Sequence, residues 1–301
     1  SKLKVLLRDA KTFGITFEPP DVNRGKYRFE PVTDKLVRYG LGAVKGTGQG
    51  AIEAIVAARE GTDANEGQGG GPFRSLFDFC ARVDRQRVNK RVVEALIKAG
   101  AFDALHPDRA TALASVPLAF DWADAQEANA LQGGLFDFGD SHAASTHEPS
   151  LAHAEPLTLR ERLMLEKAAL GFYLSGHLFD ESGAEVRRFA RRRIADLVDS
   201  REPQLLAGIV GEMRVVNGQR GRSAIFLLDD GSEAIETVVG EDLLDANREL
   251  LVDDALLIAQ GKVQVDRFNG GLRFNVNQLW DLPAARTRFG RYLVVAVNGG
   301  L

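Results

Sequence analysis

The chain has 301 residues, which is enough for two or three domains, and its apolar fraction of 45% is ordinary for a globular protein. It has no run of the roughly 20 apolar residues that a membrane-spanning helix needs, and its first residues lack the pattern of a signal peptide, so we expect a cytoplasmic protein. The single cysteine, Cys80, excludes an internal disulfide framework and is expected to be a buried, reduced thiol.

The net charge of -4 is unevenly distributed along the chain. Residues 1–100 carry 18 Lys and Arg against 12 Asp and Glu, whereas residues 101–301 carry 20 against 30. The first hundred residues are therefore the better candidate for contact with phosphate. Because the chain lacks an initiating methionine and ends just after an apolar run, we expect it to be a segment of a longer protein.

The first 39 residues begin with an expected amphipathic helix that stops near Gly14. Pro19 and Pro20 forbid a helix and favour an extended backbone before them. Asp21 and Asn23 follow, and we expect them to fix a turn.

A turn rich in glycine, from Lys45 through Gly46 and Gly48 to Gly50, precedes an expected helix with Ile52 and Ile55 on one face. Glycines before a helix let a ligand approach the backbone, and the free N–H groups at the positive end of the helix dipole suit a phosphate. The arrangement resembles a helix-hairpin-helix motif, although an ordinary connection between helices would also explain it.

A second pair of helices follows. Ser75 with Asp78 predicts a capping box before the first of them, and Asn89 is expected to cap the second, which Gly100 ends. Basic residues lie just before and at the start of the second helix, where they oppose its dipole, and we interpret them as contacts to the duplex backbone, with a merely solvated face as the alternative. They are Arg82, Arg85, Arg87, Lys90 and Arg91.

Residues 109–130 are alanine-rich and predicted to be helical, and order is expected to fall from there to about residue 157. Within this connector, the run from Gln132 to Phe138 is too apolar for a solvated linker. In an extended conformation, Phe136 and Phe138 point to one side and Leu135 to the other, which favours a peptide that docks into a pocket. The alternative is a loop that folds back onto its own domain.

Several polar residues after position 140 have no predicted chemistry. His142, His147 and His153 have no spacing typical of a metal site. A helix is expected to resume around Leu159 and to continue to Leu170, and His177 is expected to be structural. The basic run from Arg187 to Arg193 is interpreted as a solvated or ion-paired helix face.

The last part of the chain alternates apolar and polar residues with period two. We predict strands at 205–213, 223–228, 233–239, 255–265 and 272–279, and a helix at 241–250. Five strands with a helix after the third are typical of an OB-fold, whose loops bind single strands, sugars or proteins. The two loops that bind ligands in this fold contain cations and an aromatic residue, which are our candidates for binding single-stranded DNA: Arg214, Arg220, Arg222, Arg267 and Phe268.

Taken together, these motifs resemble the C-terminal half of the alpha subunit of bacterial DNA polymerase III. The resemblance rests on Pro19–Asn23, Gly40–Gly48, Val88–Val92, Ala99–Asp103, Leu165–Lys167 and Leu170–His177. Gln132, Leu135, Phe136 and Phe138 resemble the peptide with which bacterial replication proteins bind the sliding clamp. Leu178 departs from the family, which usually has proline there, so the local turn is left open.

The resemblance implies an α+β multidomain chain with a mainly helical first half and a five-stranded OB barrel. Its expected parts are the end of the polymerase fingers (1–39), a tandem helix-hairpin-helix module (40–131), a connector with the clamp-binding peptide (132–157), a helical connector (158–202), the OB-fold (203–282) and the start of another domain (283–301). Duplex and single-stranded DNA, the sliding clamp and other subunits of the polymerase III holoenzyme are the implied partners.

No catalytic residue is expected in this chain, because its acidic pairs lie in turns and loops, whereas nucleotidyl transfer needs aspartates on adjoining strands. The resemblance implies that these aspartates and their Mg²⁺ belong to a part that precedes Ser1, so we expect no cofactor here and no activity from this chain by itself. The alternatives are an error-prone paralogue of the subunit, a free-standing nucleic-acid-binding accessory protein and a protein-interaction scaffold.

Overall fold

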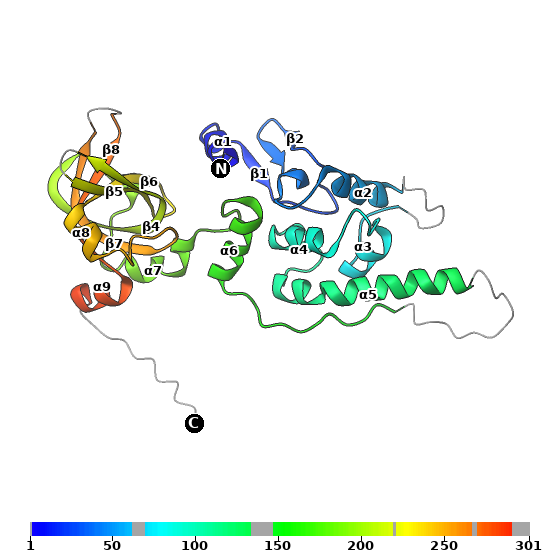
Figure 1. The fold of residues 1–301 in the computed structure, drawn as a ribbon. Helices are drawn as coiled ribbons and strands as arrows, with labels where there is room; N and C mark the ends of the chain where they lie inside the picture. The colour runs from blue at the N-terminus through cyan, green and yellow to red at the C-terminus, as the bar shows by residue number, and fades with distance from the viewer. Residues whose placement is uncertain (1, 62–69, 134–146, 219–220, 267–269, 291–301) are drawn as a thin grey trace, which may run out of the picture. The chain divides into compact units, whose positions relative to one another are not determined.

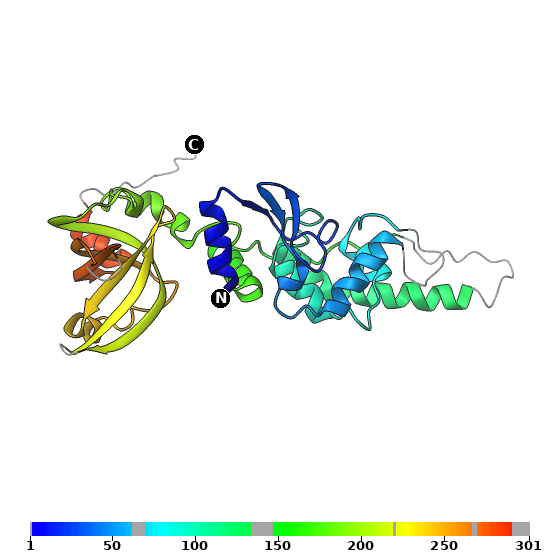
Figure 2. The ribbon, with the colours of Figure 1, turned by 90° about the horizontal axis from the view of Figure 1, so that it is seen from above.

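The computed structural model describes residues 2–61, 70–133, 147–218, 221–266 and 270–290. The chain divides into two compact units, residues 1–176 and residues 177–301 (Figures 1 and 2). The first unit is mainly helical and the second is built on a β-barrel, so the fold class is α+β as expected. None of the described helices combines the length and apolar character needed to cross a membrane.

The first unit begins with helix α1 (Lys2–Thr12) and a small sheet. The sheet has the order β1-β3-β2, with β1 (Thr16–Glu18) parallel and β2 (Glu30–Thr33) antiparallel to β3 (Leu36–Arg38). Asp21 and Asn23 fix the turn between β1 and β2, as predicted, since the Asn23 N–H donates to Asp21 Oδ1 at 2.7 Å. The Asn23 side chain also holds a distant segment by donating to the Phe73 carbonyl and accepting from the Phe73 N–H.

Two helix pairs follow, and their ends match the capping residues read from the sequence. The 3₁₀ turn η1 (Leu41–Ala43) leads into α2 (Gln49–Glu60), and α3 (Leu76–Arg82) leads into α4 (Lys90–Lys98). Ser75 accepts from the Asp78 N–H, and Asn89 accepts from the Val92 N–H. The Asp78 carboxylate accepts from the Arg74 N–H instead of closing the box on Ser75.

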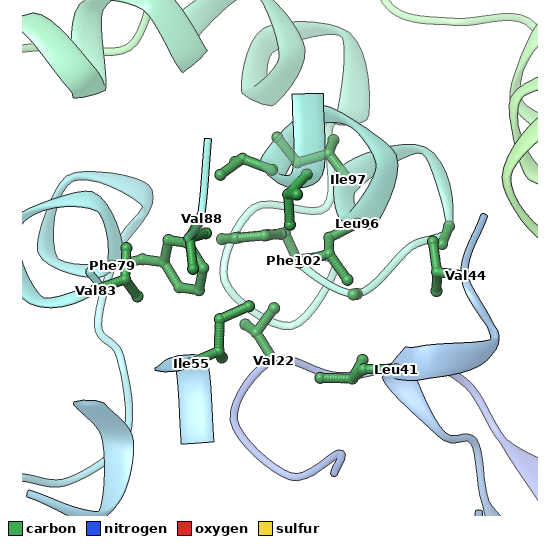
Figure 3. Close-up of a cluster of buried hydrophobic side chains, with 14 of the residues drawn as sticks. Val22, Leu41, Val44, Ile55, Phe79, Val83, Val88, Leu96, Ile97 and Phe102 are labelled. Atoms are coloured by element: carbon green, nitrogen blue, oxygen red, sulfur yellow. The ribbon is translucent and has the colours of Figure 1, made fainter. Parts of the chain in front are cut away.

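These four elements share one core, into which each helix turns its apolar face. Figure 3 shows Leu41, Val44, Ile55 of α2, Phe79 of α3 and Leu96 of α4 in one cluster of buried side chains. Phe79 lies edge-on to Phe102 with ring centroids 4.9 Å apart. Each of these side chains is at most 2% exposed, and burying one stabilises the fold by about 1.5–3 kcal/mol, so the two hairpins depend on each other for stability.

Helix α5 (Arg109–Gly133) packs on α3 and α4, and residues 147–158 return along it to α6 (Leu159–Leu170) (Figure 1). The returning segment is bound to the first unit by two hydrogen bonds. The Ala152 N–H donates to Ser115 Oγ at 2.9 Å, and the Ser75 hydroxyl donates to the Glu148 carboxylate at 2.7 Å. Part of the stretch expected to lose order is therefore packed against the helical unit.

A buried ion-pair network joins α6 to the start of α5 and to the segment between α4 and α5. Arg109, 4% exposed, donates to Asp103 at 2.7 Å and to Glu166 at 2.9 Å. Glu166 is fully buried and also accepts the N–H groups of Leu174 and Ser175 at 2.8 and 2.9 Å. Burial by itself would lower the pKa of Arg109, but the two carboxylates raise it, so the guanidinium stays charged. The network fixes the residues that follow α6 on the helical core.

The second unit opens with short turns that rest on one acidic hairpin. They are η2 (Leu178–Glu181), α7 (Gly183–Val186) and η3 (Ile194–Asp196). The side chain of Asp230 accepts from Arg187 and from the Ile194 N–H, while Asp229 accepts from His177 at 3.2 Å. His177 is structural, as expected, because it also caps η2, which begins at Leu178.

Five strands then close a barrel in the order β4-β5-β6-β8-β7. Their bounds are β4 (Ser200–Gly218), β5 (Gly221–Asp229), β6 (Ala234–Gly240), β7 (Leu256–Val265) and β8 (Leu272–Trp280). The barrel closes through the antiparallel pairing of β4 with β7, and β6 pairs with β8 in parallel. This topology is that of an OB-fold, so the fold predicted from the strand pattern is confirmed.

Helix α8 (Glu241–Ala246) follows the third strand and buries Leu244 in the barrel core. It is shorter than the predicted 241–250 because Asn247 ends it with a backbone conformation outside the helical region. Strand β4 pairs with both β5 and β7, and it bends at a bulge between Gly211 and Arg214, where Glu212 has φ +55°. Residue 261 must be glycine, since a Cβ there would lie 2.1 Å from the Asn275 carbonyl oxygen. Helix α9 (Leu282–Phe289) ends the described part.

Candidate nucleic-acid interface

The start of α2 is open to a ligand. Gly48 is its N-cap and offers no side chain to the first N–H groups of the helix. A Cβ built on Gly46, Gly48 or Gly50 would meet no atom within 4 Å, and Gly46 has φ +85°, which favours glycine. Lys45 is exposed beside them. Exposed, uncapped N–H groups at the positive end of a helix form a site that suits a phosphate.

The hairpin that presents this helix end is held rigidly from behind. The Thr47 hydroxyl donates to the carbonyls of Leu41 and Val44 at 3.0 and 2.7 Å. The Lys45 N–H donates to the Ala169 carbonyl of α6 at 2.8 Å. The backbone of Lys45 is thus positioned by α6, more than a hundred residues away in sequence.

The start of α4 differs from the start of α2, because Asn89 already caps it. The basic residues predicted around it also have different environments. Arg85 is 18% exposed and pairs with Asp124 at 3.0 Å and with Glu127. Lys90 lies 3.7 Å from Asp121, whereas Arg87, 61% exposed, pairs with Asp84 at 3.4 Å within its own turn.

Arg91 is exposed and forms no salt bridge with any described residue. Arg82 is structural, since its guanidinium donates to the carbonyls of Ala58 and Gly71 and stacks over the ring of Phe73. Among the cations of the predicted duplex site, Lys45 and Arg91 form no salt bridge with a described residue, and Arg87 pairs only within its own turn. Arg85 and Lys90 face carboxylates of α5.

The acidic face of α5 was not predicted from the sequence. Asp121, Asp124 and Glu127 recur every three residues, a spacing that places them on one side of a helix. This three-residue period in the sequence could have predicted the acidic face. The sequence could not have predicted its pairing partners, because Arg85 and Lys90 come from another helix pair.

The predicted clamp-binding residues lie at the edge of the described structure. Gln132 is in the last turn of α5, while Leu135, Phe136 and Phe138 lie outside the described residues. Both flanks of residues 134–146 belong to the first unit, through α5 on one side and the returning segment 147–158 on the other.

The predicted single-strand site is described only in part. Arg214, 64% exposed, lies 3.6 Å from Glu236, and Arg222 donates to Glu241 and Asp245 at 2.8 and 2.9 Å. Arg220, Arg267 and Phe268 lie outside the described residues. Both described arginines thus have carboxylate partners with which a DNA phosphate would compete.

The acidic pairs have structural partners. The Asp229 and Asp230 pair holds His177 and Arg187, and Asp253 accepts from the Met213 N–H. Across the described ranges, no group of three or more His, Cys, Asp and Glu side chains is placed to hold a metal ion. Cys80 is fully buried, as predicted, and burial raises the pKa of its thiol to about 12.

Comparisons with known proteins agree with this architecture. A family model described as "Helix-hairpin-helix motif" matches residues 14–112, which include both helix pairs. The DNA polymerase III subunit alpha of Neisseria meningitidis serogroup B is 42% identical to this chain over 298 residues, which is 98% of the chain. The chain is homologous to the DNA polymerase III alpha subunit. The alpha subunit of Escherichia coli K12 is 36% identical over 303 residues, 99% of the chain.

The chain spans about a quarter of the length of these alpha-subunit relatives, since each alignment covers 25% of the relative. Among solved structures, the second OB-fold domain of replication protein A from Methanococcus maripaludis matches 30% of the chain and 93% of that domain, with 14% identity and a TM-score of 0.25. The OB-fold assignment rests on the strand pairing described above.

Proposed function

We propose that this chain is the DNA-binding and clamp-binding portion of a replicative DNA polymerase III alpha subunit, which supports processive, template-directed DNA synthesis. The observation that carries the proposal is the open end of α2. Its N–H groups and Lys45 offer a phosphate site with no competing side-chain cap. Its homology to the alpha subunit supports DNA as the ligand.

The helix-hairpin-helix module would grip the duplex without reading its sequence. The phosphate contacts would come from the N–H groups of Gly48 to Gly50 and from Lys45, Arg87 and Arg91. Such contacts fix the position of a protein on DNA but carry no sequence information, which suits a polymerase that must copy every template. Because each contact releases counterions, binding should weaken steeply as salt rises.

A change of one residue tests the helix end directly. Gly48 has φ -84° and ψ 158°, which any residue adopts, and its Cβ position is free. Asp and Asn are both good N-caps, so Gly48→Asp and Gly48→Asn should each keep the helix stable. Only Asp places a negative charge where the phosphate would lie.

We expect Gly48→Asp to weaken binding of a labelled duplex by about tenfold or more at low salt, and Gly48→Asn to weaken it much less. The measurement is fluorescence anisotropy with the whole chain, with circular dichroism to check that both variants are folded. Equal duplex affinity in the two variants would show that no phosphate binds at this helix end.

The run Gln132 to Phe138 would bind the sliding clamp. The described residues on both sides of 134–146 belong to the same unit, so a clamp bound there would be tethered to the DNA-gripping module. Tethering raises the effective concentration of the second contact, and several weak contacts then give processivity without any tight site.

The test is binding of the chain to purified clamp, with Leu135 and Phe136 changed together to alanine. We expect the double variant to lose clamp binding and to keep duplex binding. Leu118→Ala is the matched control, because Leu118 is an apolar residue of α5 that is 37% exposed. Unchanged clamp affinity in the double variant would refute this part of the proposal.

A further inference from the structure

The second unit has two classes of arginine, those that form salt bridges with carboxylates and those that form none within the described residues. Seven arginines of its described ranges form salt bridges with carboxylates: Arg187, Arg193, Arg214, Arg222, Arg248, Arg273 and Arg286. Five in the same ranges form none: Arg188, Arg191, Arg192, Arg201 and Arg288. Four of these five lie in only two short segments, the turn after α7 and helix α9.

These two segments contact each other. Arg286 of α9 donates to Glu185 of α7 at 2.8 Å, and the rings of Phe189 and Phe289 stack with centroids 5.9 Å apart and an interplanar angle of 17°. Trp280 lies edge-on to Phe289 at 5.0 Å. Figure 1 shows α9 beside α7. Helix α9 and the turn that follows α7 therefore form one surface.

We name Arg188, Arg191, Arg192 and Arg288 the arginine patch. All four are exposed, and the nearby carboxylates are already used, because Glu185 pairs with Arg286 and Asp196 with Arg193. The hydrogen bond from Arg286 holds the pKa of Glu185 below its usual value, and the charge of Arg188 contributes to this shift. The patch is thus a concentration of positive charge whose four members form no salt bridge with a described carboxylate, and an anion would relieve the repulsion between them.

We propose that the arginine patch binds the phosphate backbone of single-stranded DNA. All four cations are arginine, whose planar guanidinium binds phosphate in a bidentate manner and stacks on bases. The half-buried rings of Phe189, Phe289 and Trp280 lie among them, and cations with aromatic rings are the combination that holds a flexible single strand. The inference rests on the proposed function only in taking DNA as the ligand.

The patch is separate from the loops predicted to bind single strands. Trp280 pairs with Ile258 at one end of the β7–β8 ladder, whereas Val265 pairs with Leu272 at the other end, next to the loop that carries Arg267 and Phe268. The barrel therefore offers DNA contacts at both ends of this ladder, and removing one should leave the other intact.

The experiment measures binding of the whole chain to labelled oligo(dT) of about 20 nucleotides, long enough for more than one contact. The variant is Arg188→Gln, Arg191→Gln and Arg192→Gln together. The matched control is Arg201→Gln, Arg248→Gln and Lys262→Gln, which removes the same charge from exposed positions of the same unit. Arg201 lies on β4, whose Ser200 pairs with Val263, far along β7 from Ile258.

For a single strand, the slope of log K against log[salt] should become shallower by about 0.7 for every phosphate that the protein no longer neutralises, so the slope for the variant should fall by about 2. At about 0.1 M salt this corresponds to a loss of affinity of roughly 100-fold, and the control should lose less than roughly tenfold. Arg288→Gln by itself should weaken binding as well, because it belongs to the same surface.

A duplex probe measured in parallel separates this inference from the proposed function. If the wild type binds the duplex but the patch variant and the control bind oligo(dT) equally, the inference is overturned and the proposed function stands. If the wild type binds neither probe, both fail. Circular dichroism and thermal unfolding that match the wild type would show that the loss is not due to misfolding.

Discussion

Glu166 should be among the most costly residues to change in the helical unit. Its side chain is 1% exposed and accepts three hydrogen bonds, one from the guanidinium of Arg109 and two from the N–H groups of Leu174 and Ser175. In Glu166→Gln the shape is kept, but the charge is lost and an amide NH₂ must face at least one of these donors. Of its two carboxylate partners, Arg109 would then keep only Asp103, which is 41% exposed.

Removing one partner of a buried ion pair costs about 3–5 kcal/mol. Because Asp103 still compensates part of the Arg109 charge, we expect Glu166→Gln to lower the free energy of unfolding of the first unit by about 3 kcal/mol, at the low end of that range. The pair between Glu94 and Lys98 is the control, since both side chains are exposed and 3.9 Å apart. Glu94→Gln should cost less than about 1 kcal/mol.

The assay is urea unfolding of the whole chain in a Trp280→Phe background, followed by circular dichroism and by the fluorescence of Trp122 in α5, which then reports on the first unit. The chain has two units, so the two signals need not coincide and each is fitted separately. A cost for Glu166→Gln as small as that for Glu94→Gln would refute the reasoning. A double-mutant cycle with Arg109→Gln would then measure whether the two residues interact at all.

Three further outcomes follow from other buried groups. The pKa of His177 is raised, because its hydrogen bond to Asp229 and the charges of Asp229, Asp180 and Asp230 outweigh burial, which by itself would lower it. The protonated His177 should therefore stabilise the fold fully below about pH 6.5, and this stabilisation should be lost as the pH rises through the raised pKa of the folded state. Native-state hydrogen exchange of the barrel should show this pH dependence, and His177→Gln should abolish it. Cys80, with a pKa of about 12, should react with a thiol reagent at about pH 8 only as fast as the unit unfolds, and rapid labelling of the folded chain would contradict its burial. The Tyr39 hydroxyl is buried and has no hydrogen-bond partner among the described residues. Tyr39→Phe should therefore raise the free energy of unfolding by about 1 kcal/mol, which a higher urea midpoint would show. A lower midpoint would show that the hydroxyl does form a hydrogen bond.

Local signals in the sequence were sufficient for most elements. Ser75 and Asn89 cap the helices that they were predicted to cap, and the five barrel strands lie within a few residues of their predicted bounds, apart from the longer β4. These features depend on short-range chemistry, a side chain bonding to an N–H group three residues away or a backbone that alternates its faces. The order of strands and helix then limits the barrel to a few topologies.

The partners of the charged residues were decided only by the tertiary structure. A run of arginines near α4 and another after α7 look alike in sequence, yet Arg85 pairs with the acidic face of α5, while Arg188 and Arg191 form no salt bridge with a described carboxylate. Similarly, Glu166 stood out only as part of a family motif, and its role appeared when Arg109 and the backbone after α6 were brought to it. Which charges remain free to bind DNA depends on contacts between segments far apart in the chain, and local sequence patterns do not encode those contacts.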